Sequence, residues 1–130
     1  MIKPKNTVKR DLCYTTSHEW IDFQNIEAFI GITGFRLTGV KQIKGIAFVR
    51  IYGLKKRGEV LANIQSDKGS LQVRMPVEGK IICINDTILL LGQNLLLTKP
   101  ETDGWLVKIL VSQPCERKGL MPSQEYIPFT

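Results

Sequence analysis

Hydrophobic and polar residues alternate along several short stretches of the chain, and the clearest stretch follows a polar turn. In it, apolar residues occupy every second position, at Leu71, Val73, Met75 and Val77. A period of two is typical of a half-buried strand. A second apolar run, residues 60–64, precedes the turn. The residues between the two runs include Asp, Gly and Ser, which favour a tight turn, so the pattern predicts an antiparallel hairpin.

Further apolar runs predict more strands, and few stretches favour a helix. The predicted strands cover residues 14–23, 26–32, 46–52, 79–84 and 105–111, with a turn at Gln24 and Asn25 between the first two. The Leu-rich segment 88–97 fits a strand or a helix equally well, because short apolar runs do not separate the two by period alone. The pattern therefore indicates a mainly β protein.

Length and composition indicate one globular domain. The chain has 130 residues, of which 43% are hydrophobic, enough for one core and too few for two ordinary domains. It contains no apolar run of about 18 residues, the length that a membrane span needs. The N-terminus has no apolar stretch typical of a secretory signal. We expect a cytoplasmic protein, in which Cys13, Cys83 and Cys115 are reduced thiols rather than disulfides or metal ligands.

The net charge of +6 is unevenly distributed. Residues 1–57 hold 11 Lys and Arg against 4 Asp and Glu, whereas residues 58–130 hold 7 against 8. A basic face can attract nucleic acid, lipid or an acidic partner. Because aromatic residues are not interleaved with the basic ones, as base stacking requires, we favour a solvated basic surface over nucleic-acid binding.

Lys68 is the candidate functional residue of the predicted hairpin. It lies at the centre of the turn, where we expect its side chain to be in solvent and accessible to a modifying enzyme. Acylation would remove its charge and lengthen the side chain. An ordinary solvated turn lysine is the alternative that Asp-Lys-Gly alone leaves open.

Ordered motifs give the hairpin a family resemblance. The turn 65–69, followed by residues 75–81, resembles the hairpin of lipoyl domains, in which the turn lysine carries lipoate. Residues 14–20, with the sequence YTTSHEW, resemble the opening motif of the glycine cleavage system H protein. Residues 31–33 and 103–109 follow in the order found in that family. The resemblance covers residues 12–112.

The resemblance implies a fold and a domain organisation. The fold is a mainly β, flattened barrel-sandwich hybrid of lipoyl/biotinyl type, with one or two short helices. One helix is implied near residues 35–44 and another near 116–129, although Gly and Pro residues weaken both. The resemblance implies a lipoyl-type domain over 12–112 and a C-terminal tail over 113–130. Residues 1–11 are polar and basic without an apolar period, so we expect them to be a flexible leader.

The resemblance also implies a carrier function without catalysis. Lipoate would be attached to Lys68 by a lipoate ligase or lipoyltransferase, with Gln65, Ser66, Asp67 and Gly69 recognised in the turn. The arm would carry an aminomethyl group from glycine decarboxylase to aminomethyltransferase, and dihydrolipoamide dehydrogenase would reoxidise it. We expect a monomer. The single His and the lack of a nucleophile motif, phosphate loop or metal-ligand cluster give no support to catalysis.

A cleft for the arm is implied by the same motif. The amine at the end of a loaded arm is cationic near neutral pH if its basicity resembles that of lysine, so the cleft should offer carboxylates or hydroxyls. Ser17 and Glu19 are the residues that the motif assigns to it. We interpret His18 as a packing histidine next to Trp20. Trp20 and Trp105 are expected to pack in the core or the cleft wall.

Several positions depart from the family pattern and leave alternatives open. Gln65 stands where Glu usually precedes the lysine, Asp67 where a small apolar residue is usual, and Gln72 where Asp is common. H proteins are typically acidic, whereas this chain is basic. An H-like carrier that serves a different enzyme set, or a scaffold that is not lipoylated, therefore remains an alternative to a carrier of the glycine cleavage system.

Overall fold

The computed structural model describes residues 9–91 and 94–126. Most of the leader expected over 1–11 and the last residues of the tail lie outside the described residues. In chain order the elements are β1 Leu12–Tyr14, β2 Glu19–Gln24, β3 Glu27–Ile32, the 3₁₀ helix η2 Phe35–Leu37, β4 Ile43–Phe48, β5 Leu54–Lys55, β6 Val60–Ser66, β7 Gly69–Arg74, β8 Gly79–Ile84, α1 Asp86–Leu91, α2 Asn94–Thr98, β9 Val107–Val111 and β10 Met121–Pro122.

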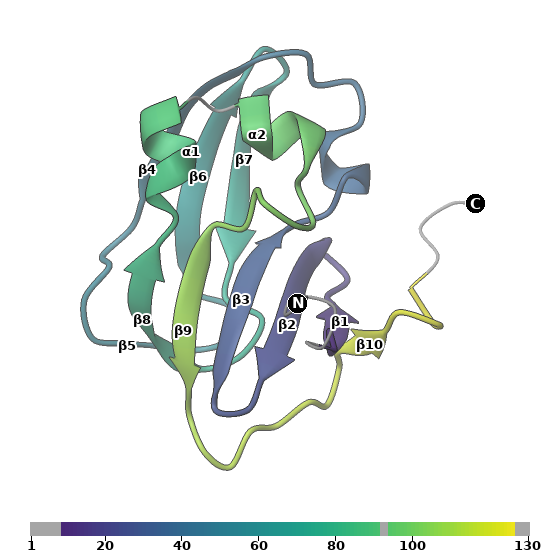
Figure 1. Ribbon diagram of the computed structural model, residues 1–130, viewed down its shortest axis with the longest axis vertical. Helices are drawn as coiled ribbons and strands as arrows, with labels where there is room; N and C mark the ends of the chain where they lie inside the picture. Colours follow the sequence, from purple (N-terminus) through teal and green to yellow (C-terminus); the bar gives the residue numbers. More distant parts are fainter. Residues whose placement is uncertain (1–8, 92–93, 127–130) are drawn as a thin grey trace, which may run out of the picture.

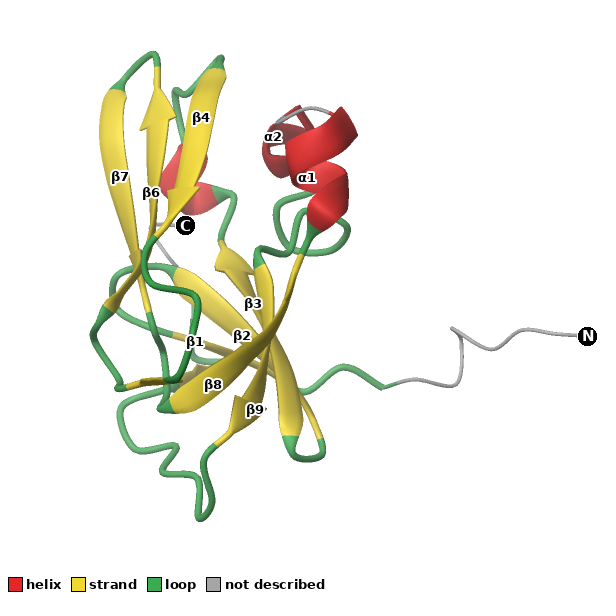
Figure 2. Ribbon diagram, turned by 90° about the vertical axis from the view of Figure 1, so that its left-hand side faces the viewer, coloured by secondary structure: helices red, strands yellow, loops and turns green. Residues whose placement is uncertain are grey.

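These strands form two antiparallel sheets, which confirms the mainly β fold of barrel-sandwich type. The larger sheet has seven strands in the order β10-β1-β2-β3-β9-β8-β5, and the smaller has three in the order β4-β6-β7 (Figure 1). Figure 2 shows the three-stranded sheet and the two α-helices at one end of the molecule, beyond the seven-stranded sheet. The β6–β7 turn therefore lies at an extremity of the molecule.

The predicted hairpin of β2 and β3 is confirmed, and a glycine explains its close packing. Gln24 pairs with Glu27, and the intervening Asn25 has a φ of 61°, a left-handed conformation that Asn tolerates in tight turns. Gly31 lies opposite Trp20 in the register. A Cβ on Gly31 would lie 2.7 Å from three atoms of the indole ring, so only glycine fits beside the buried tryptophan.

One hydrophobic core joins the two sheets. The larger sheet contributes buried residues such as Ile21 and Ile30, and the smaller contributes Leu61, Ile64 and Val73. Each of these five side chains is fully buried. Because burying such a side chain stabilises the fold by about 1.5–3 kcal/mol, this shared core fixes how the β6–β7 hairpin sits on the larger sheet.

The helix predicted over 35–44 is much shorter in the structure. The structure has only the single turn of η2, and the chain leaves helical geometry at Thr38, whose ψ is 127°. Gly39 follows with a φ of +84°, in the left-handed region. Gly39 and the two flanking residues thus extend the chain toward β4 instead of continuing the helix. The strand predicted over 46–52 is also displaced, because β4 spans Ile43–Phe48.

The Leu-rich segment forms helices, which settles the ambiguity between strand and helix. Residues 86–91 and 94–98 form α1 and α2. Asn85 positions the first of them, because its side-chain oxygen accepts a hydrogen bond from the Thr87 amide at 3.1 Å. Its amide group also donates to the carbonyls of Asp103 and Trp105, at 3.0 and 2.8 Å. The side chain of Asn85 therefore ties the start of α1 to the segment before β9.

The described part of the C-terminal tail contains a strand in place of the expected helix. Within residues 113–126, Met121 and Pro122 form β10, which pairs with Tyr14 and Cys13 of β1. Pro114 and Pro122 each remove a backbone donor, which is unfavourable inside a helix and tolerated at a sheet edge. The domain boundary at residue 112 stays a prediction.

In the described parts of the chain, no helix has the length and apolar character needed to cross a membrane.

Candidate functional site

Lys68 lies at the tip of the β6–β7 hairpin. Ser66 pairs with Gly69, so Asp67 and Lys68 alone make the loop. Lys68 is exposed, and both ribbon views place this turn at one end of the molecule (Figures 1 and 2). Among the contacts found within residues 9–91 and 94–126, no ion pair or side-chain hydrogen bond involves its ammonium group. The amine is therefore accessible for modification, as predicted.

Ser66 fixes the backbone of the turn from inside. Its hydroxyl accepts a hydrogen bond from the Lys68 amide at 3.0 Å and donates one to the Gly69 carbonyl at 2.9 Å. The side chain is 6% exposed. Gly69 has a φ of +106°, which favours glycine, and nothing lies within 4 Å of the position of its missing Cβ. Both residues thus have a structural reason to be in this turn.

Asp67 joins the tip to the segment before β4. Its carboxylate accepts hydrogen bonds from the amides of Lys41 and Gln42, both at 3.0 Å. Its own amide donates to the Gln42 carbonyl at 3.1 Å. The two amides, that of Gln42 first, hold the pKa of Asp67 below its usual value. Because three hydrogen bonds join Asp67 to the adjacent segment of the same chain, the loop that carries Lys68 is fixed on one side.

Gln65 lies on the exposed side of the same hairpin. Its side-chain amide donates to the Ser70 hydroxyl at 3.2 Å, and its register partner in β7 is Ser70. Gln65, Ser66, Asp67 and Gly69 therefore lie beside Lys68 in the turn, and their recognition by an attaching enzyme stays a prediction.

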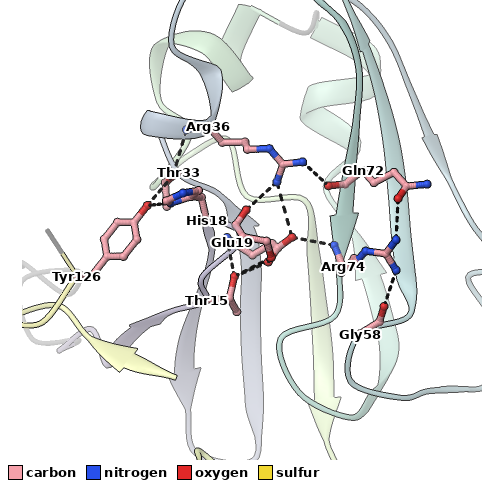
Figure 3. A network of polar contacts seen from close by, with 10 residues as sticks. Thr15, His18, Glu19, Thr33, Arg36, Gly58, Gln72, Arg74 and Tyr126 are labelled. Atoms are coloured by element: carbon pink, nitrogen blue, oxygen red, sulfur yellow. Dashed lines mark hydrogen bonds and ion pairs between the residues drawn. The ribbon is translucent and has the colours of Figure 1, made fainter. Parts of the chain in front are cut away.

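Glu19 lies where the hairpin meets the larger sheet, and it is the centre of a polar cluster (Figure 3). It is 1% exposed. Its Oε1 accepts hydrogen bonds from the hydroxyls of Thr15 and of Ser17, the latter at 2.6 Å. Its Oε2 accepts from the Arg74 amide of β7 at 3.0 Å. One buried carboxylate thus links β2 to the edge of the smaller sheet.

Two arginines complete this cluster. Arg36 donates from Nη1 to the Ser17 carbonyl at 2.7 Å and from Nη2 to the Gln72 carbonyl at 2.9 Å, and its Nη1 lies 3.9 Å from Oε2 of Glu19. Arg74 donates to the Gln72 side chain and to the Gly58 carbonyl, both at 2.8 Å. We call the set of Thr15, Ser17, Glu19, Arg36, Gln72 and Arg74 the Glu19 network.

Ser17 and Glu19 line a cavity at this junction. Its volume is about 170 Å³, and it is also lined by Arg74 at the end of β7 and by Met75 and Pro76 just after it. The structure therefore brings Ser17 and Glu19 together beside β7. It also surrounds them with positive charge, which the motif alone did not indicate.

His18 packs against aromatic rings beside the Glu19 network. Its Nδ1 lies 2.6 Å from the Tyr126 hydroxyl, and its ring lies 4.6 Å from that of Phe35. Burial first, and then the nearby Arg36, lower the pKa of His18. Tyr126 also stacks on Tyr14 with ring centroids 4.1 Å apart and donates to the Thr33 hydroxyl. The packing role expected for His18 is confirmed with Phe35 and Tyr126 as partners, whereas its contact with Trp20 stays a prediction.

The two tryptophans also pack as expected. Trp20 is fully buried and donates to the carbonyls of Ile32 and Pro100, at 3.1 and 2.9 Å. Trp105 meets Phe29 edge to face, with centroids 5.1 Å apart.

Sequence reasoning missed Arg36 and Thr15 as members of the site. Thr15 lies four residues before Glu19 in the same motif, and a hydroxyl so close to a buried carboxylate was a usable signal. Arg36 had no such signal, because it lies in the stretch assigned to a helix and contacts residues far from it in sequence.

The fold and the exposed hairpin lysine define a class of protein. A two-sheet β sandwich that presents one lysine on a tight hairpin tip is the arrangement of a lipoyl-type carrier domain.

Comparison with known proteins identifies the family within that class. Residues 12–130 match the family model described as glycine cleavage H-protein. The chain is 32% identical over 120 residues to the probable glycine cleavage system H protein of Aeropyrum pernix, covering 92% of this chain and 83% of the relative. It is also 32% identical over 116 residues to the H protein of Thermotoga maritima, covering 89% and 93%. The chain belongs to the glycine cleavage H-protein family, whose members are lipoyl carriers and not catalysts.

A solved structure shares the fold. The crystal structure of a glycine cleavage system H protein from Mycobacterium marinum superposes with a TM-score of 0.76 at 22% identity, covering 92% of this chain and 95% of that one.

Proposed function

We propose that Lys68 carries lipoate and that the chain acts as the lipoyl carrier of a glycine cleavage system. In this function it passes an aminomethyl group from glycine decarboxylase to aminomethyltransferase and is reoxidised by dihydrolipoamide dehydrogenase. The observation that supports the proposal most strongly is the position of Lys68, exposed on a two-residue loop whose backbone is fixed by Ser66 and Asp67.

The residues at the tip fit an attached lipoyl group. The Lys68 amine is exposed, so an attaching enzyme can reach it without unfolding the hairpin. Asp67 and Ser66 hold the loop in one backbone geometry, which lowers the entropic cost of recognition by a lipoate ligase or lipoyltransferase. Gln65 and Gly69 flank the loop, and we propose that they are recognised with it.

The lipoyl group would supply a disulfide on a long flexible stem, which accepts and releases cargo in several active sites. Gln72 lies four residues beyond Lys68 on β7, about 13 Å away at 3.3–3.4 Å per residue. A group on Lys68 that folds back along the hairpin therefore meets the Glu19 network. We propose that Ser17 and Glu19 line the space into which the arm folds.

The charge of the chain supports a second candidate. A carrier with a net charge of +6 docks best on acidic partner surfaces. An H-like carrier that serves a different enzyme set in the same cytoplasmic compartment is therefore the alternative to be tested.

The test compares the lipoylated and unmodified forms of the chain as carriers for purified glycine decarboxylase. The readout is release of CO₂ from carboxyl-labelled glycine. We expect release to rise with the concentration of the lipoylated chain and to stay at background with the unmodified chain. The lipoylated H protein of Thermotoga maritima is the positive control. Background release with the lipoylated chain, beside an active control, would contradict the glycine cleavage role and favour the second candidate.

A further inference from the structure

Three oxygen atoms beside β7 converge on one cation. They are the carbonyl oxygens of Ser17 and Gln72, which accept hydrogen bonds from Arg36 at 2.7 and 2.9 Å, and Oε2 of Glu19, which lies 3.9 Å from the same guanidinium. Figure 3 shows the Arg36 side chain reaching across to Gln72 of β7, close to Glu19. The same oxygens are the type of acceptor that an ammonium group needs.

Most acceptor sites of the Glu19 carboxylate are already used within the protein. A carboxylate offers about four lone-pair sites. In Glu19 two of these accept the hydroxyls of Thr15 and Ser17 and a third accepts the Arg74 amide, while Nη1 of Arg36 forms an ion pair with Oε2 at 3.9 Å, beyond hydrogen-bond distance. An ammonium group that approaches Oε2 of Glu19 must therefore compete with the Arg36 guanidinium.

Nearby charge adds to this exclusion. The Arg74 guanidinium lies on the Gln72 side chain, with Nη2 donating to Oε1 at 2.8 Å. Residue 72 is a neutral glutamine, so it does not offset the charge of the two arginines. The Arg36 and Arg74 guanidinium groups thus both bind Gln72, one at its backbone carbonyl and one at its side-chain oxygen, and their charge repels a third cation.

We infer that the Arg36 guanidinium occupies the cation-binding position of this cleft and excludes the amine end of a loaded arm from it. The inference rests on the proposed attachment of the arm at Lys68. Arg36 is then a specificity-determining residue: it leaves the cargo amine in solvent, where it is open to partner enzymes and to water. Removing the guanidinium frees the carboxylate and the two carbonyls for an ammonium group.

The first test uses methylammonium chloride and the unmodified chain, so it does not depend on lipoylation. We expect methylammonium to shift the NMR amide signals of Ser17, Glu19 and Gln72 in Arg36→Gln. The affinity of this variant for methylammonium should be at least tenfold higher than that of the wild type. Arg36→Met, which keeps part of the aliphatic stem, is the second variant and should behave alike. Arg36→Lys should resemble the wild type, because its own ammonium fills the position.

Two controls separate this binding from general charge effects. Arg50→Gln removes an arginine that is paired with Glu59 at 2.8 Å elsewhere on the surface, and it should leave methylammonium binding unchanged. Glu19→Gln added to Arg36→Gln should abolish the gained binding. Equal binding by the wild type and folded Arg36→Gln, or no binding by either folded variant that removes the guanidinium, would overturn the inference.

The second test uses the lipoylated protein with its arm aminomethylated. Water releases the cargo by the reaction R–S–CH₂–NH₃⁺ + H₂O → R–SH + CH₂O + NH₄⁺, in which the C–S and C–N bonds break and a C=O bond forms. We expect formaldehyde release to be at least threefold slower from Arg36→Gln than from the wild type or Arg36→Lys. Equal release from all three would contradict exclusion of the loaded arm. Failure of lipoylation would count against the proposed function alone, because the methylammonium titration is independent of it.

Discussion

The two ends of the β6–β7 hairpin are each fixed by a carboxylate, and the two carboxylates work in different surroundings. At the tip, exposed Asp67 accepts two backbone amides of the adjacent segment. At the base, Glu19 is buried, accepts hydroxyl and backbone-amide donors, and forms an ion pair with Arg36 at 3.9 Å. The tip bonds set a local loop geometry, whereas the base bonds couple the two sheets. A carrier needs both, because its lysine must be reachable while the domain that presents it stays folded.

The largest loss of folding stability is expected at the base of the hairpin, from Glu19→Ala. The change leaves the Thr15 and Ser17 hydroxyls and the Arg74 amide without their acceptor, and Arg36 without its counter-charge. Loss of a buried acceptor from a charged cluster costs about 3 kcal/mol. Urea unfolding would measure the loss.

Glu27→Ala is the matched control for this change. Glu27 is 40% exposed and pairs with Lys108 at 3.1 Å, and such surface pairs are worth about 0–1 kcal/mol. If Glu19→Ala lowers the free energy of unfolding no more than Glu27→Ala, the base is not the coupling point of the two sheets.

An intermediate loss of folding stability is expected in the turn, from Gly69→Ala. No atom lies within 4 Å of the added Cβ, so the cost arises from the φ of +106° alone, and we expect a loss of about 1 kcal/mol. Gly45→Ala is the control, because Gly45 also has open space around it but no left-handed φ. Its effect should lie within about 0.5 kcal/mol of zero. Equal destabilisation by the two changes would show that backbone strain at Gly69 is absent.

The smallest effect on global stability is expected at the tip, from protonation or substitution of Asp67. The folded-state pKa of Asp67 is depressed by the Gln42 and Lys41 amides. Its contribution is therefore complete above the ordinary aspartate value of about 3.9 and is lost as pH falls through the lower folded-state pKa.

NMR can follow this titration at the tip itself. We expect the amide signals of Lys41 and Gln42 to shift below about pH 4, with a midpoint under the ordinary aspartate value of about 3.9, while the core signals stay fixed. Asp67→Asn should remove the pH dependence and leave urea unfolding almost unchanged. A midpoint above the ordinary value would mean that the carboxylate does not accept these amides in solution.

The tip was predictable from sequence and the base only in part, because their contacts differ in range. The period-two pattern around Lys68 and the turn residues Ser66 and Gly69 act within one hairpin, so local rules located them. Glu19 was assigned to the cleft from its motif. The ion pair of Glu19 with Arg36 was not predicted, because that contact joins a turn and a strand with no common period in sequence. The helix expected over 35–44 is shortened by a local cause instead: the chain leaves helical geometry at Thr38 and continues through the left-handed Gly39.

The most direct test of the attachment site is the intact mass of the chain after co-expression with a lipoate ligase and lipoate. Lys41→Arg is the control for Lys68→Arg, because both lysines are exposed and Lys41 adjoins the tip through the bond from its amide to Asp67. We predict one lipoyl increment on the wild type and on Lys41→Arg, mapped to Lys68, and none on Lys68→Arg. A lipoyl increment on Lys68→Arg, or an unmodified wild type beside a fully modified control H protein, would contradict the assignment.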